Sequence, residues 1–147
     1  MLIARKEQNM NELILLIAML FFHLLDDYKL QGMLIDFKQK SWWEKNYPNK
    51  LYKNDYMIAL IEHAFSWTVM VHIPVTIYIY ATGYYNINNM YFAIIYLCIF
   101  YLNVVWHAVV DNLKANKKLI NLWVDQVCHI IQIVLTWYFY ISIRFAK

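Results

Sequence analysis

Residues 90–111 read MYFAIIYLCIFYLNVVWHAVVD, and this stretch decides the fold. It is apolar over almost its whole length, contains no glycine or proline, and lacks the alternation that marks a half-buried strand. A bilayer core takes about 20 helical residues at a rise of about 1.5 Å each, so the stretch is long enough to cross a membrane. Because lipid offers no partners to backbone polar groups, a helix is the expected form.

Three further segments, residues 13–35, 56–82 and 119–143, are also largely apolar and long enough to cross a membrane. The chain of 147 residues is 62% hydrophobic and 16% charged, with only 2 Gly and 2 Pro, which is too apolar for a soluble domain of this length. We therefore predict one all-α domain over residues 1–147, an integral membrane bundle of four transmembrane helices.

The loops predict the orientation of this bundle. The loop at residues 36–55 and the connection after residue 111 are rich in lysine, whereas residues 83–89 carry no charge. The positive-inside rule then places both lysine-rich loops in the cytoplasm and both chain ends outside, in a cell (inner) membrane. Trp42 and Trp43 beside the loop lysines indicate a lipid interface rather than a nucleic-acid site, so the expected partner is the bilayer. A homo-oligomer or a partner subunit stays open.

Histidines and carboxylates recur four residues apart inside three of the predicted helices. Residues four apart share one helix face. A carboxylate at the bilayer centre costs roughly 2.5–3.5 kcal/mol, so these faces should point into the bundle. Counted from the lysine-rich helix ends, all of these groups lie at about one depth, together with a histidine of the second helix. The candidates are His23 and Asp27, then His63, then His107 and Asp111, and finally Asp125 and His129.

Imidazoles and carboxylates on facing helices form a ligand set for Zn, Fe or Mn, and helical bundles hold such sites in their cores. The seven candidates exceed the four ligands of a tetrahedral zinc, which allows either two ions or one ion with extra carboxylates that orient its ligands. The same residues also suit a proton or ion path in a transporter, channel or sensor, or a structural network of hydrogen bonds. We favour the metal site.

As an enzyme, such a protein would be a metal-dependent hydrolase in which a metal-bound water attacks a lipid or another phosphoester. Asp27, Lys114 and Gln126 are then the candidate catalytic residues. Lys114 follows Asp111 by three residues. Its ammonium group could neutralise the Asp111 carboxylate, bind an anion or extend to the lipid interface.

Three other polar residues carry weaker expectations. His72 stands alone beside Pro74 and is expected to be a hydrogen-bonded packing residue. Asp26 and Glu62 point about 100° away from their stronger neighbours, and we expect them to pair with Lys29 or with the loop lysines.

Three motifs together resemble a known family. HLLDDYKLQ at residues 23–31, HAVVDNLK at 107–114 and DQVCH at 125–129, with His63 between the first two, look like the small bacterial and phage membrane proteins catalogued as domain of unknown function number 3307. The resemblance implies a multi-pass membrane protein with these polar residues as a shared signature, and it implies no activity. The repeated His-x3-Asp pattern further suggests two like-oriented helix hairpins.

Overall fold

The computed structural model describes residues 2–83 and 90–143, and all regular structure in these ranges is helical, which confirms the all-α prediction. Four long helices dominate: α1 (Leu2–Leu25), α4 (Asp55–Thr82), α5 (Met90–Ala115) and α6 (Leu122–Ile143). Short elements connect α1 to α4. They are a π-helical turn (Asp26–Leu30), α2 (Leu34–Phe37), α3 (Lys40–Asn46) and a 3₁₀ turn (Lys50–Tyr52).

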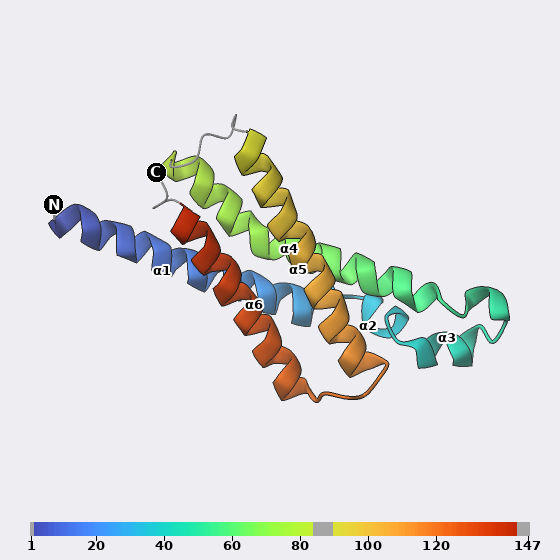
Figure 1. Ribbon diagram of the computed structural model, residues 1–147. Coiled ribbons are helices and arrows are strands. Elements are labelled where there is room, and N and C mark those ends of the chain that lie inside the picture. Colours follow the sequence, from blue (N-terminus) through green and yellow to red (C-terminus); the bar gives the residue numbers. More distant parts are fainter. Residues whose placement is uncertain (1, 84–89, 144–147) are drawn as a thin grey trace.

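The four long helices form a bundle in which consecutive long helices run in opposite directions (Figure 1). Helix α4 packs against α1, α5 and α6, and α6 also packs against α1 and α5. Met19, Trp67, Val75 and Ile133 are fully buried in the core between them. Large apolar side chains cover the outside of α5 and α6, where a bilayer would cover them.

Three helical segments within the described ranges are long and apolar enough to cross a membrane, rather than the four that we predicted. They are Lys50–Thr82, Met90–Ala115 and Leu122–Ile143. Helix α1 is not among them. It begins at Leu2, well before the predicted residue 13, and carries Lys6, Glu7 and Glu12 in its first half.

The predicted helix over residues 13–35 is also broken at its far end. The α-helix stops at Leu25, a π-helical turn follows, and Gly32 then takes a φ of 52°. This left-handed conformation costs glycine little, so the chain leaves the helix at this point. After this break the next segment, α2, turns back toward the bundle and packs against α4.

The other predicted boundaries move by a few residues. Helix α5 continues to Ala115, four residues beyond the predicted end at 111. Helix α6 begins at Leu122 instead of 119, because the side chain of Asn121 accepts the backbone N–H of Val124 at 3.0 Å and so caps its first turn. Part of the predicted loop 36–55 is helical, in α3 and the 3₁₀ turn.

Candidate metal centre

The π-helical turn after α1 brings two neighbouring carboxylates to one histidine of α4. Asp27 Oδ1 lies 3.5 Å from His63 Nε2, and Asp26 Oδ2 lies 3.7 Å from Nδ1 of the same ring. Asp26 also accepts a hydrogen bond from Ser66 at 2.9 Å. We expected Asp26 to pair with Lys29 or a loop lysine, and its contacts with His63 and Ser66 correct this expectation. The wider π turn spaces successive residues differently from an α-helix, and such turns are frequent at functional sites.

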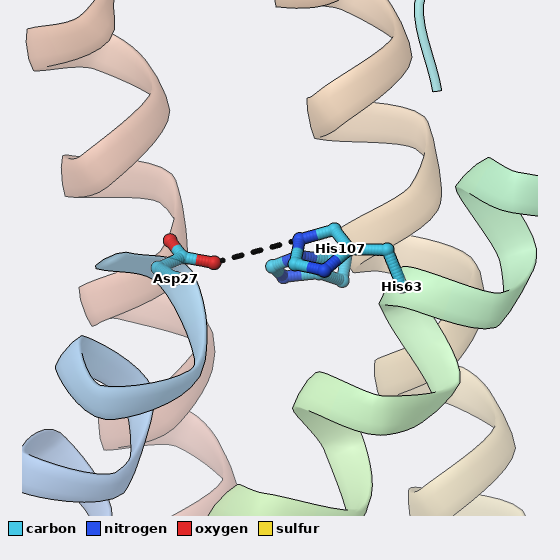
Figure 2. Close-up of side chains that lie close together, drawn as sticks. All are labelled: Asp27, His63 and His107. Carbon is cyan, nitrogen blue, oxygen red and sulfur yellow. Dashed lines mark hydrogen bonds and ion pairs between the residues drawn. The ribbon is translucent and has the colours of Figure 1, made fainter. Parts of the chain in front are cut away.

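Three imidazoles from α4, α5 and α6 meet beside these carboxylates. His63 Nε2 lies 3.2 Å from His107 Nε2, and the His107 ring stacks on the His129 ring with centroids 4.1 Å apart. Figure 2 shows Asp27 facing the rings of His63 and His107 from the opposite side of the site. All three histidines are buried.

Asp111 of α5 joins the imidazoles on both sides of His107. Its Oδ2 lies 3.4 Å from His63 Nε2, and its Oδ1 lies 3.4 Å from His129 Nε2. Oδ1 also lies 3.9 Å from His107 Nε2. One carboxylate therefore has one oxygen on each side of the site.

Two overlapping groups of side chains could each hold a metal ion. Asp27, His63 and His107 form one, and His107, Asp111 and His129 form the other, with the potential ligand atoms of each group within 4.8 Å of one another. We call these two groups together the His/Asp cluster. A tetrahedral ion with bonds of about 2.0–2.1 Å has ligands about 3.3 Å apart. The contact of 3.2 Å between two imidazoles and the contacts of 3.4–3.5 Å between imidazoles and carboxylates match this spacing.

The two remaining predicted ligands flank the cluster. Asp125 Oδ1 lies 3.5 Å from His129 Nε2, while its Oδ2 pairs with Lys114 at 2.6 Å. Lys114 therefore neutralises Asp125 and not Asp111, its neighbour on the same helix. His23 Nδ1 accepts the indole N–H of Trp67 at 2.8 Å and lies 3.7 Å from Asp27 Oδ2.

The side chain of Gln126 links Asp27 to Asp125. Its amide donates to Asp27 Oδ2 and to Asp125 Oδ2, each at 3.2 Å. The structure thus brings all seven predicted metal-site residues and Gln126 to one place. Five of them, from four elements, form the cluster.

Lys38 is a site residue that the sequence did not identify. It follows α2, is buried, and places its Nζ 2.6 Å from Asp111 Oδ2. Asn116, just after α5, holds the surrounding loop in place, because its amide donates to the Lys38 carbonyl at 3.1 Å and its Oδ1 accepts the Lys40 N–H at 2.7 Å. Lys38 is one of several lysines in the loop at 36–55, and nothing in the sequence distinguishes it from the others.

Trp67 is a second residue whose place the sequence did not reveal. Its ring stacks on His107 with centroids 4.3 Å apart and planes 24° apart, in addition to its hydrogen bond with His23. His72 lies away from the cluster, as expected for a packing residue: its Nδ1 contacts the Thr68 carbonyl at 2.8 Å, and its ring packs against Phe100.

Among the residues that the structure describes, the charges around the cluster do not balance when the imidazoles are neutral. Four carboxylates, those of Asp26, Asp27, Asp111 and Asp125, are shielded from solvent, and two ammonium groups, those of Lys38 and Lys114, pair with them. With neutral imidazoles, two negative charges remain. Unpaired charge in a buried site is expensive, so a divalent cation, or two protons, would stabilise this arrangement.

No family model, no curated protein and no solved structure matches this chain. Over the described residues, its fold and site define a helical protein with three membrane-length apolar helices and a buried His/Asp group that could hold a metal ion.

Proposed function

We propose that this chain is a multi-pass membrane protein that binds a divalent transition metal, Zn, Fe or Mn, inside its helical bundle. The observation that carries the proposal is the convergence of three imidazoles and two carboxylates, with contacts of 3.2–3.9 Å, where neutral imidazoles would leave two negative charges of the described chain unpaired. We further propose that α1 crosses the membrane with the other three long helices, its polar end covered by α4 and α6.

The distances favour an ion over a network of hydrogen bonds. Charge-assisted hydrogen bonds are typically about 2.7–2.9 Å long. Asp111 and Asp125 make contacts as short as 2.6 Å with lysine, so their oxygens do approach true donors closely. The same two carboxylates stay 3.4–3.9 Å from the imidazoles, a range that suits ligands on either side of an ion.

Several buried polar atoms of the cluster and of the flanking Asp125 also have no hydrogen-bond partner among the described residues. They include Nδ1 of His107, both ring nitrogens of His129 and Oδ1 of Asp125. Each unsatisfied buried group costs about 1–3 kcal/mol. An ion bound between His107, Asp111 and His129 would engage some of these atoms directly. A second ion, beside His63, would share Asp111 as a bridging ligand because the two oxygens of this carboxylate face different imidazoles.

A proton path is the second candidate, because buried polar side chains continue beyond the cluster between α5 and α6. Asn103, Gln132 and Thr136 hydrogen-bond to one another at 2.7–3.1 Å. Amide side chains do not readily gain or lose protons near neutral pH, so this network is poorly suited to a relay. Proton flux through liposomes that contain the purified protein would support the relay, and we expect none.

Elemental analysis of the full chain tests the metal proposal. We expect about one to two equivalents of Zn or Mn, one for each group of the cluster, in protein purified in detergent without chelator, loaded with the ion and separated from free ion. Co²⁺ should quench the fluorescence of Trp67, which stacks on His107. Trp67→Phe should remove this quenching, whereas the exposed control Trp106→Phe should retain it. Less than a tenth of an equivalent of every metal tried would rule out the proposal.

Asp26 is a positioning residue in this scheme. Its Oδ2 faces His63 Nδ1, and a carboxylate behind a ligating imidazole fixes the ring orientation and raises its basicity. We expect Asp26→Asn to weaken metal binding by about 10–100-fold, as such partners do elsewhere, while the protein still folds. Equilibrium dialysis against Zn²⁺ measures the change. Glu62→Gln, at an exposed carboxylate next to His63, is the matched control and should bind as the unchanged protein does.

A further inference from the structure

A cavity of about 400 Å³ opens onto the His/Asp cluster at the end of the bundle where α2 faces the connection between α5 and α6. It adjoins two carboxylates of the cluster, and most of its other polar lining can donate hydrogen bonds. Its polar lining includes Asp27, Gln31, Lys38, Asp111, Lys114 and Gln126.

The two lysines give the cavity its chemical character. Lys38 and Lys114 each present an ammonium group with three N–H donors, of which one reaches a carboxylate at 2.6 Å. Lys114 keeps about a third of its side chain exposed, at 34%, so it is accessible from outside the protein. The amides of Gln31 and Gln126 also line the cavity, and both donate hydrogen bonds to Asp27.

Metal binding would change what these lysines contact. Asp111 and Asp125 hold the lysines with the oxygens Oδ2, and Asp111 is also a candidate ligand. An ion that draws these carboxylates toward itself weakens their hold on the lysines. The ammonium groups are then available to another anion in the cavity, next to the ion.

From this juxtaposition we propose that the cavity binds the phosphate group of a phosphomonoester, with one phosphate oxygen directed at the ion and others at Lys38 and Lys114. The proposal rests on the metal site above and names the class of substrate that the site would take. A phosphate has three terminal oxygens, enough for an ion and for two ammonium groups from different elements, whereas a carboxylate has two. With two ions bound, the site would carry two positive charges, the complement of a phosphate dianion.

The phosphate group can come from a soluble ester or from a lipid headgroup. Tyr28, Ile35 and Leu122 also line the cavity and are exposed apolar or aromatic side chains, a surface on which a lipid glycerol and acyl chain could lie. The test therefore uses inorganic phosphate in one arm. The other arm uses nanodiscs of phosphatidylcholine with or without phosphatidic acid, the lipid whose headgroup is a phosphomonoester.

The experiment measures phosphate binding and metal content in the same samples of the full chain. We expect zinc-loaded protein to bind inorganic phosphate or phosphatidic acid more tightly than metal-free protein. Lys114→Met should weaken this binding at least about tenfold, the loss expected for one charge-assisted hydrogen bond. Lys117→Met, an exposed lysine three residues away, is the control and should not change it.

Each outcome bears on one of the two proposals. Binding in the nanodisc arm alone identifies a lipid headgroup, and binding in both arms identifies the phosphate group itself. A zinc-loaded protein that binds neither probe, or a Lys114→Met protein that binds both as well as the unchanged chain, overturns the phosphate proposal while the metal site stands. If no metal binds but the Lys114-dependent phosphate binding persists, the metal proposal fails, and the phosphate proposal is overturned in its metal contact while the lysine contacts stand.

Discussion

Asp111→Asn should lower the affinity for a divalent metal by more than about 100-fold, since even residues that only orient metal ligands are worth about 10–100-fold. Asp111 places one oxygen beside His63 and the other beside His129, so the substitution affects both groups of the cluster at once. The amide of asparagine has nearly the same shape but no charge, which leaves the packing between α5 and its neighbours intact. Elemental analysis after dialysis against Zn²⁺ reports the loss.

Asp36→Asn is the matched control, because Asp36 is an exposed carboxylate of α2 and its change leaves the cluster untouched. It should bind the ion as the unchanged chain does. If Asp111→Asn instead retains full metal content while its thermal unfolding temperature falls, Asp111 serves a structural hydrogen-bond network and not a metal site.

Lys38→Met should make the metal-free protein less stable and should make the protein bind metal more tightly. Lys38 is the cation paired with buried Asp111, and removing one partner of a buried ion pair typically costs about 3–5 kcal/mol. The same substitution removes a positive charge that competes with the ion for the Asp111 oxygen. The attraction between the Lys38 ammonium group and the Asp111 carboxylate, 2.6 Å apart, is worth several kcal/mol even at an effective dielectric constant of about 20. We therefore expect a gain in metal affinity of at least about tenfold.

Thermal unfolding with and without Zn²⁺ measures both effects of Lys38→Met. The unfolding temperature should fall in the metal-free protein and recover largely when the ion is added. Lys40→Met is the control, because Lys40 belongs to the same loop but pairs with Glu44 on the surface, at 3.5 Å, where such pairs contribute about 0–1 kcal/mol. A Lys38→Met protein that zinc does not stabilise would contradict the view that lysine and metal compete for one carboxylate.

Residue spacing was enough to predict the long helices and most of the site. Long apolar runs indicate α4, α5 and α6, because within lipid a helix satisfies its own backbone polar groups, and the single proline in these runs, Pro74, does not end α4. His107 and Asp111 share a helix face through their spacing of four, and the cost of charge in a membrane turns that face inward. The two like-oriented hairpins, the resemblance to domain of unknown function number 3307 and the loop orientation stay predictions.

The approach of two neighbouring carboxylates to one histidine could not be read from spacing. Asp26 and Asp27, at the start of the π-helical turn Asp26–Leu30, both contact His63, one at each ring nitrogen, although neighbours in an α-helix point about 100° apart. Such a turn depends on how the end of α1 packs against α4, and the local sequence has no distinct signal for it.

By itself, therefore, the sequence determined two things. Its apolar runs indicated the long helices, and the cost of exposing charge to lipid indicated seven of the residues that gather at the site. Only the tertiary structure decided how the charges are paired. Lys38 reaches Asp111 across 73 positions of sequence, because Gly32 ends the first helix and Asn116 holds the loop against the end of α5. Local propensity carries no information about such a contact, since its stability comes from a buried carboxylate that is distant in the chain.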